Sequence, residues 1–305
     1  MFIDRLIEKI KLTNNPSVIG LDPRIEFIPE HIMQQANADS ETVTGAIGKA
    51  FFEFNRQIID AIADIVPCVK PQLACYEAIG LPGIQAFEQT VRYAKERGLL
   101  VIADGKRNDI GSSAEGYAQG FFSRHAFVCD ALTVNPYLGY DGIEPFIKSC
   151  REHNTGIFIL AKTSNPSSGQ LQDLLLQSGE TVAEKVAALI HDWGQPLIGK
   201  YHYSSVGAVV GATYPAQAAT LRAIMPQAYI LVPGYGAQGG SAKDIAPNFN
   251  KDGLGAIVNA SRSIMLAYQS KHWCGQFSEL QFAAAARAEA LRMRDDINAV
   301  LAVGC

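Results

Sequence analysis

Eight short apolar segments, separated by stretches of helical periodicity, constrain the fold of this chain more than any other feature. The segments lie at 16–21, 66–71, 100–103, 131–135, 156–161, 206–211, 229–232 and 256–259. Each is too uniformly apolar to leave one face in water, which is typical of parallel strands covered by helices. Eight such strands close into a barrel, so the sequence predicts an α/β protein with a (β/α)₈ TIM-barrel fold.

The spacing of apolar residues between these segments predicts the outer helices. They are expected at 43–65, 84–94, 114–122, 143–150, 171–176, 182–193 and 216–225. An open, doubly wound sheet would also alternate strands and helices, but it usually stops at about five or six strands and carries G-x-G-x-x-G after the first one. That glycine pattern is absent after the first segment, which favours the closed barrel.

The length of 305 residues fits one barrel of about 250 residues with extensions. No low-complexity linker marks a second domain. We therefore expect a single barrel domain over 1–305, with an N-terminal helix over 1–14, an insertion over about 24–42 and a C-terminal helix over about 278–299.

The composition excludes several classes of partner. A formal net charge of −4 lacks the basic footprint of a nucleic-acid-binding protein. No apolar run approaches the roughly 18 to 20 residues that span a bilayer, and the start of the chain is amphipathic rather than a secretory signal. We expect a cytoplasmic protein that binds small molecules and neither nucleic acid nor membrane. The six cysteines form no C-x-x-C pair, which favours buried, reduced thiols.

The third apolar segment runs directly into three charged residues, Asp104, Lys106 and Asp109. Residues two apart in a strand face the same way, so Asp104 and Lys106 should project together, provided that the chain stays extended through Gly105. Asp109 lies beyond the strand and is free to reach elsewhere. A surface turn with an incidental ion pair would use the same residue types, so the other strand ends decide the interpretation.

Polar residues also follow most of the other predicted strands. In barrels of this kind the active site lies at the carboxyl ends of the strands, where such side chains converge. The positions are Asp22, Lys70, Asp104 with Lys106, Asn135, Thr163 with Ser164, Gln238, and Ser261 with Arg262. Two lysines and two carboxylates in one mouth approximately cancel, so each can stay ionised where water is scarce.

The loops after the seventh and eighth strands have the composition of a phosphate site, which this fold usually builds there. Glycines let backbone amides approach an anion closely. Four of them lie in the first loop: Gly234, Gly236, Gly239 and Gly240. Arg262 and Ser263 then precede a short helix expected over 264–268, and the helix N-terminus and the guanidinium both favour a dianion.

In combination, these residues resemble orotidine 5'-phosphate decarboxylase, and most closely the longer bacterial branch of that family. The resemblance covers about 17–268. The motifs that carry it are Lys70-Pro-Gln, Asp104-x-Lys106-x-x-Asp109-Ile, Thr163-Ser-Asn-Pro, the glycine-rich loop 233–240, and Asn259-x-Ser-Arg262-Ser-Ile.

The resemblance implies a role for each matching residue. Lys70, Asp104, Lys106 and Asp109 resemble the alternating Lys-Asp-Lys-Asp array of the family, in which the last aspartate reaches into the neighbouring subunit of a homodimer. The implied substrate contacts are Asp22 and Ser113 to the ribose, Ser164 to the pyrimidine edge, and Gln238 and Arg262 to the phosphate. Ser113 stands where the family usually has threonine, and it keeps the hydroxyl.

The implied reaction converts orotidine 5'-phosphate to uridine 5'-phosphate and CO₂, the last step of de novo pyrimidine nucleotide synthesis, without a metal or an organic cofactor. Lys106 would deliver a proton to the C6 carbanion, and Asp104 would lie against the departing carboxylate.

Three alternatives stay open. A magnesium-dependent sugar-phosphate decarboxylase or hexulose-phosphate synthase shares D-x-K-x-x-D, but it places an acidic metal ligand where this chain has Lys70. A Schiff-base aldolase would use Lys162 or Lys106 as nucleophile. A non-catalytic sensor of phosphorylated ligands would keep the barrel without turnover.

Overall fold

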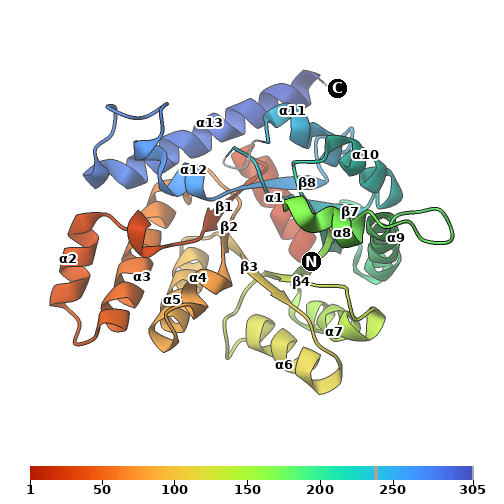
Figure 1. Ribbon diagram of the computed structural model, residues 1–305, viewed down its shortest axis with the longest axis horizontal. Helices are drawn as coiled ribbons and strands as arrows, with labels where there is room; N and C mark the ends of the chain where they lie inside the picture. The colour runs from red at the N-terminus through yellow and green to blue at the C-terminus, as the bar shows by residue number, and fades with distance from the viewer. Residues whose placement is uncertain (237–239, 304–305) are drawn as a thin grey trace.

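The computed structural model describes residues 1–236 and 240–303, and a closed barrel of eight parallel strands forms its centre (Figure 1). Each strand pairs with the next along the chain, and the last pairs with the first. The strands are β1 (Ser17–Leu21), β2 (Cys68–Pro71), β3 (Leu100–Arg107), β4 (Ala131–Val134), β5 (Gly156–Lys162), β6 (Ser204–Val210), β7 (Ala228–Val232) and β8 (Ala256–Ala260). The predicted (β/α)₈ barrel is therefore confirmed.

Helices cover the outside of the barrel and alternate with the strands (Figure 1). They are α1 (Phe2–Thr13), α2 (Glu30–Ala38), α3 (Val43–Ile62), α4 (Leu73–Glu77), α5 (Leu81–Glu96), α6 (Gly111–Phe122), α7 (Glu144–His153), α8 (Gly169–Gln172), α9 (Val182–Gly194), α10 (Pro215–Ile224), α11 (Ala242–Ile245), α12 (Arg262–Met265) and α13 (Phe282–Val303). The long ones match the apolar periodicity of the sequence, because that stripe is what each helix buries against the sheet.

The N-terminal helix α1 closes the amino end of the barrel. Its apolar face packs against residues at the starts of the strands, among them Val18 and Leu100. Phe2 makes an edge-to-face contact with Phe158, with ring centroids 6.2 Å apart. A Cβ at position 156 would lie 2.3 Å from the Phe2 ring, so glycine is required there. The carboxyl ends of the strands are left to form the site.

Four local expectations need correction. The stretch 24–42, which the sequence suggested to be an irregular insertion, contains α2, whose Ile32 and Ala36 are buried on the side packed against α3. Helical structure expected over 171–176 is confined to α8, which ends at Gln172. The short helix after the eighth strand begins at Arg262 rather than at 264. The last helix runs over Phe282–Val303 rather than 278–299.

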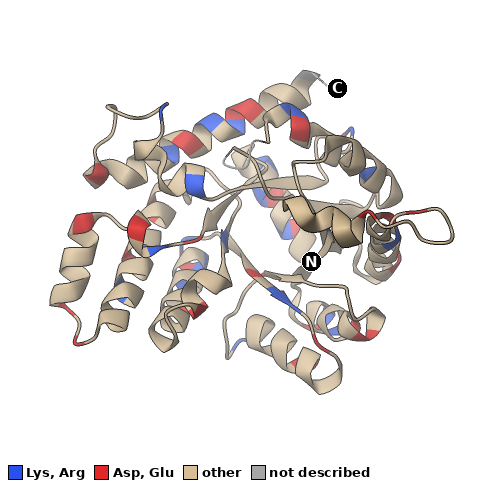
Figure 2. Ribbon diagram, in the orientation of Figure 1, with Lys and Arg blue, Asp and Glu red and all other residues tan. Residues whose placement is uncertain are grey.

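The C-terminal helix α13 packs on the barrel exterior, mainly against α3. Phe282 stacks on Phe54 with ring centroids 5.0 Å apart. Arg287 donates a hydrogen bond of 2.6 Å to the carbonyl of Ala61. Acidic and basic residues follow one another along α13 (Figure 2), and Arg292 forms an ion pair of 2.6 Å with the buried Glu289.

In the described part of the chain, no helix combines the length and apolarity that a membrane crossing requires. Cys68, Cys129 and Cys150 are buried as expected, whereas Cys274 is exposed. Burial raises the pKa of the half-buried Cys75 thiol to about 11, with Asp22 adding to the effect. Cys75 is therefore a thiol rather than a thiolate at neutral pH.

Candidate active site

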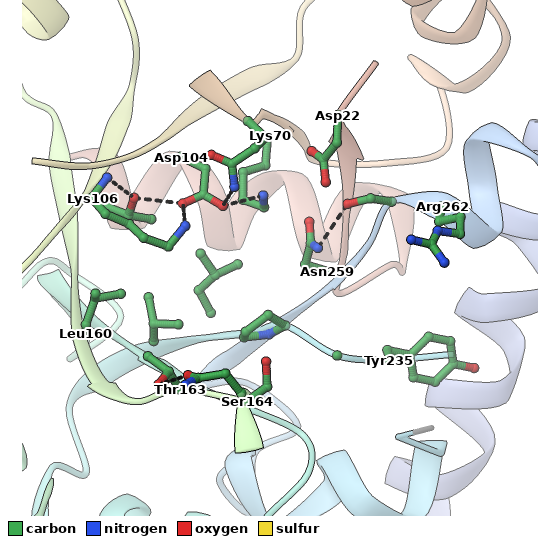
Figure 3. Close-up of a pocket in the computed structure, with 18 of the residues that line it drawn as sticks. Asp22, Lys70, Asp104, Lys106, Leu160, Thr163, Ser164, Tyr235, Asn259 and Arg262 are labelled. Atoms are coloured by element: carbon green, nitrogen blue, oxygen red, sulfur yellow. Dashed lines mark hydrogen bonds and ion pairs between the residues drawn. The ribbon is translucent and has the colours of Figure 1, made fainter. Parts of the chain in front are cut away.

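A cavity of about 610 Å³ opens at the carboxyl ends of the strands (Figure 3). All eight strands contribute to its wall, either directly or through the residue that follows them. The polar residues that the sequence singled out and that line this cavity are Asp22, Lys70, Asp104, Lys106, Thr163, Ser164, Ser261 and Arg262. The structure therefore brings together residues that lie in, or just after, β1, β2, β3, β5 and β8 and are up to 240 positions apart in the sequence (262 − 22).

Asp104 is the centre of the polar cluster and accepts hydrogen bonds from four donors. Lys70 Nζ and Gln72 Nε2 bind its Oδ2 at 2.7 and 3.0 Å. Lys106 Nζ and Thr133 Oγ1 bind its Oδ1 at 2.7 and 2.9 Å. A buried carboxylate with this many donors is held in one orientation, because leaving any one of them unpaired costs free energy.

The sequence predicted that Asp104 and Lys106 project together because the strand stays extended through Gly105, but the local geometry of β3 is different. The chain is not extended at Lys106, whose φ is 46°, and the pairing with β4 changes register between Ala103 and Arg107. Thr133 Oγ1 accepts a hydrogen bond of 2.9 Å from the Lys106 backbone N–H and so supports this conformation. The expected side-chain pair is present, but a bulge rather than regular alternation positions the lysine.

Opposite charges keep the cluster ionised. Burial favours the neutral form of Lys70, but the attraction of Asp104 and Asp22 outweighs burial and raises the pKa of Lys70. Burial likewise disfavours the Asp104 carboxylate, yet Lys70 and Lys106 together hold the pKa of Asp104 well below its usual range. Lys106 is about half exposed, so its ammonium can meet a ligand in the cavity while it contacts Asp104.

Two acceptor atoms of cavity residues have no hydrogen-bond partner among the described residues. Asp22 Oδ1 and Asn259 Oδ1 are buried and make no hydrogen bond within the described residues. Such acceptors suit a ligand that carries hydroxyl donors, since an unpaired buried oxygen is costly. Asn259 Nδ2 donates a hydrogen bond of 3.3 Å to Ser261 Oγ. A Cβ on Gly20 would lie only 1.9 Å from the same Ser261 Oγ, so glycine leaves room for this serine.

Arg262 and the loop after β7 form the far end of the cavity (Figure 3). The Arg262 side chain is exposed and has no ion-pair or hydrogen-bond partner in the described ranges. Gly236 has a φ of 71° and donates a hydrogen bond of 2.9 Å to the carbonyl of Gly240. A Cβ on Gly236 would lie 3.6 Å from Ser263 Oγ, so this loop lies against the start of α12. Gln238 and Gly239 lie outside the described residues.

Tyr235, in the same loop, connects this end of the cavity to the C-terminal helix. Its side chain is buried, and its hydroxyl donates a hydrogen bond of 3.3 Å to Asp296 of α13. Burial and the neighbouring Asp296 raise the pKa of Tyr235 to about 12, so the hydroxyl keeps its proton and acts as a donor. The sequence did not identify this residue.

Several predicted site residues do not line the cavity of this subunit: Asp109, Ser113, Asn135, Gly236, Gly240 and Ser263. Asp109 is half-buried after β3, where its Oδ1 accepts a hydrogen bond of 2.8 Å from the Ile110 backbone. Ser113 is exposed on α6. Ile110 and Tyr117 beside them are exposed apolar residues. Roles for Asp109 and Ser113 therefore stay predictions that require a second subunit.

Several cavity residues were given no role from the sequence, including Gln72 of the Lys70-Pro-Gln motif. Gln72 lies two residues after Lys70, so the same rule that paired Asp104 with Lys106 could have found it. Thr133 lies within a strand and gives no local signal. Arg24 and Phe27 follow β1 in the supposed insertion and line the cavity mouth.

Lys162, one of the two candidate Schiff-base nucleophiles, does not line the cavity. Its side chain is fully buried, and its ammonium forms an ion pair of 2.7 Å with Asp173.

Fold and site together define a class of protein: a (β/α)₈ barrel whose mouth contains a Lys–Asp–Lys cluster and, in the same cavity, an arginine that has no partner among the described residues. Residues 19–273 match the model of the orotidine 5'-phosphate decarboxylase / HUMPS family. The chain belongs to this family.

Relatives of nearly the same length support this assignment. An orotidine 5'-phosphate decarboxylase of Rhodopirellula baltica is 41% identical over 97% of this chain and 99% of its own. One of Clostridium acetobutylicum is 40% identical over 99% of this chain and all of its own (100%). The solved structure of Leishmania donovani OMP decarboxylase is 28% identical, covers 98% of both chains and superposes with a TM-score of 0.75.

Proposed function

We propose that this protein is a carboxy-lyase that converts orotidine 5'-phosphate to uridine 5'-phosphate and CO₂, with Lys106 as the proton donor. The observation that carries the proposal is the Lys70–Asp104–Lys106 cluster, held at one end of a cavity that has Arg262 at its other end. The names of the full-length relatives support the same activity.

The proposed orientation of the substrate follows from the chemistry of the cavity wall. The phosphate binds Arg262 and the loop around Gly236, Gly239 and Gly240, with Gln238 and Ser263 as further donors. The ribose hydroxyls donate to the free oxygen of Asp22, and Asn259 offers a second acceptor. Ser164 hydrogen-bonds the edge of the pyrimidine. This orientation puts C6 of the pyrimidine and its carboxylate beside Lys106 and Asp104.

The proposed chemistry uses only the charges of the cluster. As the C6–carboxylate bond breaks, its electron pair stays on C6 and CO₂ leaves. Repulsion between Asp104 and the substrate carboxylate is relieved at that point, whereas attraction between Lys106 and the carbanion grows. Lys106 then transfers a proton to C6. Binding of the remote phosphate also contributes to rate, because it holds C6 in place.

Purified protein tests the activity directly. The absorbance of orotidine 5'-phosphate should fall as the pyrimidine loses its carboxylate, and uridine 5'-phosphate should appear in equal amount. A protein that binds the nucleotide without this change would be a sensor rather than an enzyme. An adduct trapped on a lysine by borohydride would instead support Schiff-base chemistry.

Turnover should be unaffected by a metal chelator. The magnesium-dependent alternative needs an acidic ligand at the end of β2, but Lys70 occupies that position and would repel a divalent cation. We expect the same kcat before and after exhaustive treatment with EDTA. Loss of turnover with EDTA, followed by recovery with Mg²⁺, would contradict the proposal and favour the sugar-phosphate enzymes.

The proposal includes a cytoplasmic homodimer in which Asp109 completes the site of the partner subunit and Ser113 contacts the ribose there. Exposed apolar side chains near Asp109, including Ile110 and Tyr117, support an interface at this edge.

Hybrid dimers provide the test. Lys106→Ala and Asp109→Ala chains, each nearly inactive alone, should recover about a quarter of wild-type activity when mixed equally and allowed to exchange. Half of the dimers are then hybrids, and each hybrid has one site with both native residues. If both residues act within one subunit, mixing should restore no activity.

A further inference from the structure

Lys162 at the end of β5 is a fully buried charge that the proposed chemistry does not use. Leu160 lines the cavity, and regular alternation would point Lys162 the same way. The pairing with β6 changes register there, because Leu160 pairs with Val209 and Lys162 with Val210. This bulge inserts one residue into β5 and turns the lysine away from the cavity.

The Lys162 ammonium joins three separate segments of the chain. It binds Asp173 Oδ1 at 2.7 Å, just after α8, and lies 4.6 Å from the centre of the Tyr214 ring, just before α10. Asp173 also accepts a hydrogen bond of 3.1 Å from Gln217 of α10. The segment after β5 is thus attached to both β5 and α10 through one carboxylate.

Gln172, the neighbour of Asp173, connects the same segment to Thr163 in the cavity wall. Gln172 Oε1 accepts a hydrogen bond of 2.9 Å from the Thr163 backbone N–H, and its Nε2 donates one of 2.9 Å to Thr163 Oγ1. Ser164, the next residue, lies against Gly211, where a Cβ would be only 2.8 Å from Ser164 Cβ. The backbone that presents Ser164 to the cavity is therefore held from both sides.

Apolar packing cannot replace these polar contacts in the segment after β5. Leu171, Leu174 and Leu175 are about half to three-quarters exposed, at 48%, 53% and 74%, so the segment buries little apolar surface of its own. Lys162 is fully buried whereas the Asp173 side chain is 37% exposed. Because an unpaired buried ammonium is costly, Lys162 holds Asp173 in this position.

We infer that Lys162 and Asp173 are positioning residues, which act through Gln172 and Thr163 to set Ser164 for contact with the pyrimidine. The inference rests on the proposed function, in which Ser164 meets the base. The pair therefore governs recognition of the base and leaves recognition of the ribose phosphate to Asp22 and Arg262.

Two ligands distinguish recognition of the base from recognition of the ribose phosphate in the Asp173→Asn variant. Uridine 5'-phosphate has the base, whereas ribose 5-phosphate lacks it. We expect the variant to bind uridine 5'-phosphate about tenfold more weakly than the wild type, the loss of one charge-assisted contact, while its affinity for ribose 5-phosphate changes less than about twofold. Calorimetric titration measures both. In turnover, KM should rise more than kcat falls.

Matched controls and a second variant keep the test decisive. Glu180→Gln removes a carboxylate from the same segment that pairs with Lys185 rather than with Lys162. This control should leave the affinities for both ligands unchanged. Lys162→Met removes the other partner and should reproduce the selective loss. Equal losses for both ligands, or no loss, in folded Asp173→Asn protein would overturn the inference. Failure of the wild type to bind uridine 5'-phosphate would instead overturn the proposed function, and the inference with it.

Discussion

Replacement of Lys106 by alanine is expected to lower kcat by roughly 10⁴-fold or more, because one ammonium both stabilises the carbanion and supplies the proton. The cavity should otherwise persist in this variant, since Asp104 keeps Lys70, Gln72 and Thr133 as donors. Single-turnover measurement of CO₂ release from orotidine 5'-phosphate gives the rate of the chemical step.

Binding of the product provides the control for Lys106→Ala. Uridine 5'-phosphate should still bind, because the proposed orientation puts its phosphate at Arg262, at the other end of the cavity from position 106. Lys148→Ala, a change at an exposed lysine on α7, should retain full turnover. Near-normal kcat in Lys106→Ala would remove Lys106 from the mechanism and leave the proposed chemistry without a proton donor.

Replacement of Arg262 by alanine is the second change with a large expected effect, a fall in kcat/KM of about 10²- to 10³-fold. Arg262 is exposed and makes no ion pair in the described part of the protein. Its guanidinium can therefore bind a phosphate with two hydrogen bonds without first breaking an internal contact. Steady-state kinetics with orotidine 5'-phosphate measure the loss.

A substrate without phosphate shows whether Arg262 acts through that group. The slow turnover of the nucleoside orotidine should be the same in the wild type and in Arg262→Ala, because the guanidinium has nothing to bind there. Arg262→Lys should recover part of the activity, since lysine keeps the charge but lacks the planar pair of donors. An equal loss with both substrates would place the action of Arg262 elsewhere.

The glycine-rich loop and the C-terminal helix are connected in a way that sequence patterns do not reveal. The contact between Tyr235 and Asp296 joins residues 61 positions apart. Arg292 in turn pairs with Asp296 at 2.7 Å and with Glu289 at 2.6 Å. The end of the cavity at Tyr235 and Arg262 is thus supported from outside the barrel by α13, a helix whose role the sequence left open.

The sequence by itself determined the barrel and the identity of its charged cluster. Both follow from short-range rules: a uniformly apolar run of four to seven residues reads as a buried strand, and a polar residue at its carboxyl end lies at the mouth of the barrel. Lys70, Asp104 and Lys106 could therefore be assigned before any distance was known. The helix α2 escaped notice because only Ile32 and Ala36 of its nine residues are buried, which is too weak a periodic signal.

Only the tertiary structure decided how the cluster is held. The bulges at Lys106 and Lys162 depend on strand pairing with β4 and β6, and pairing register is a property of two strands rather than of one. For the same reason the sequence did not reveal Thr133, an ordinary strand residue. Its hydroxyl donates a hydrogen bond to Asp104 and accepts one from the Lys106 backbone N–H. Contacts between segments far apart in the chain have no local pattern, because folding alone brings their atoms within hydrogen-bonding distance.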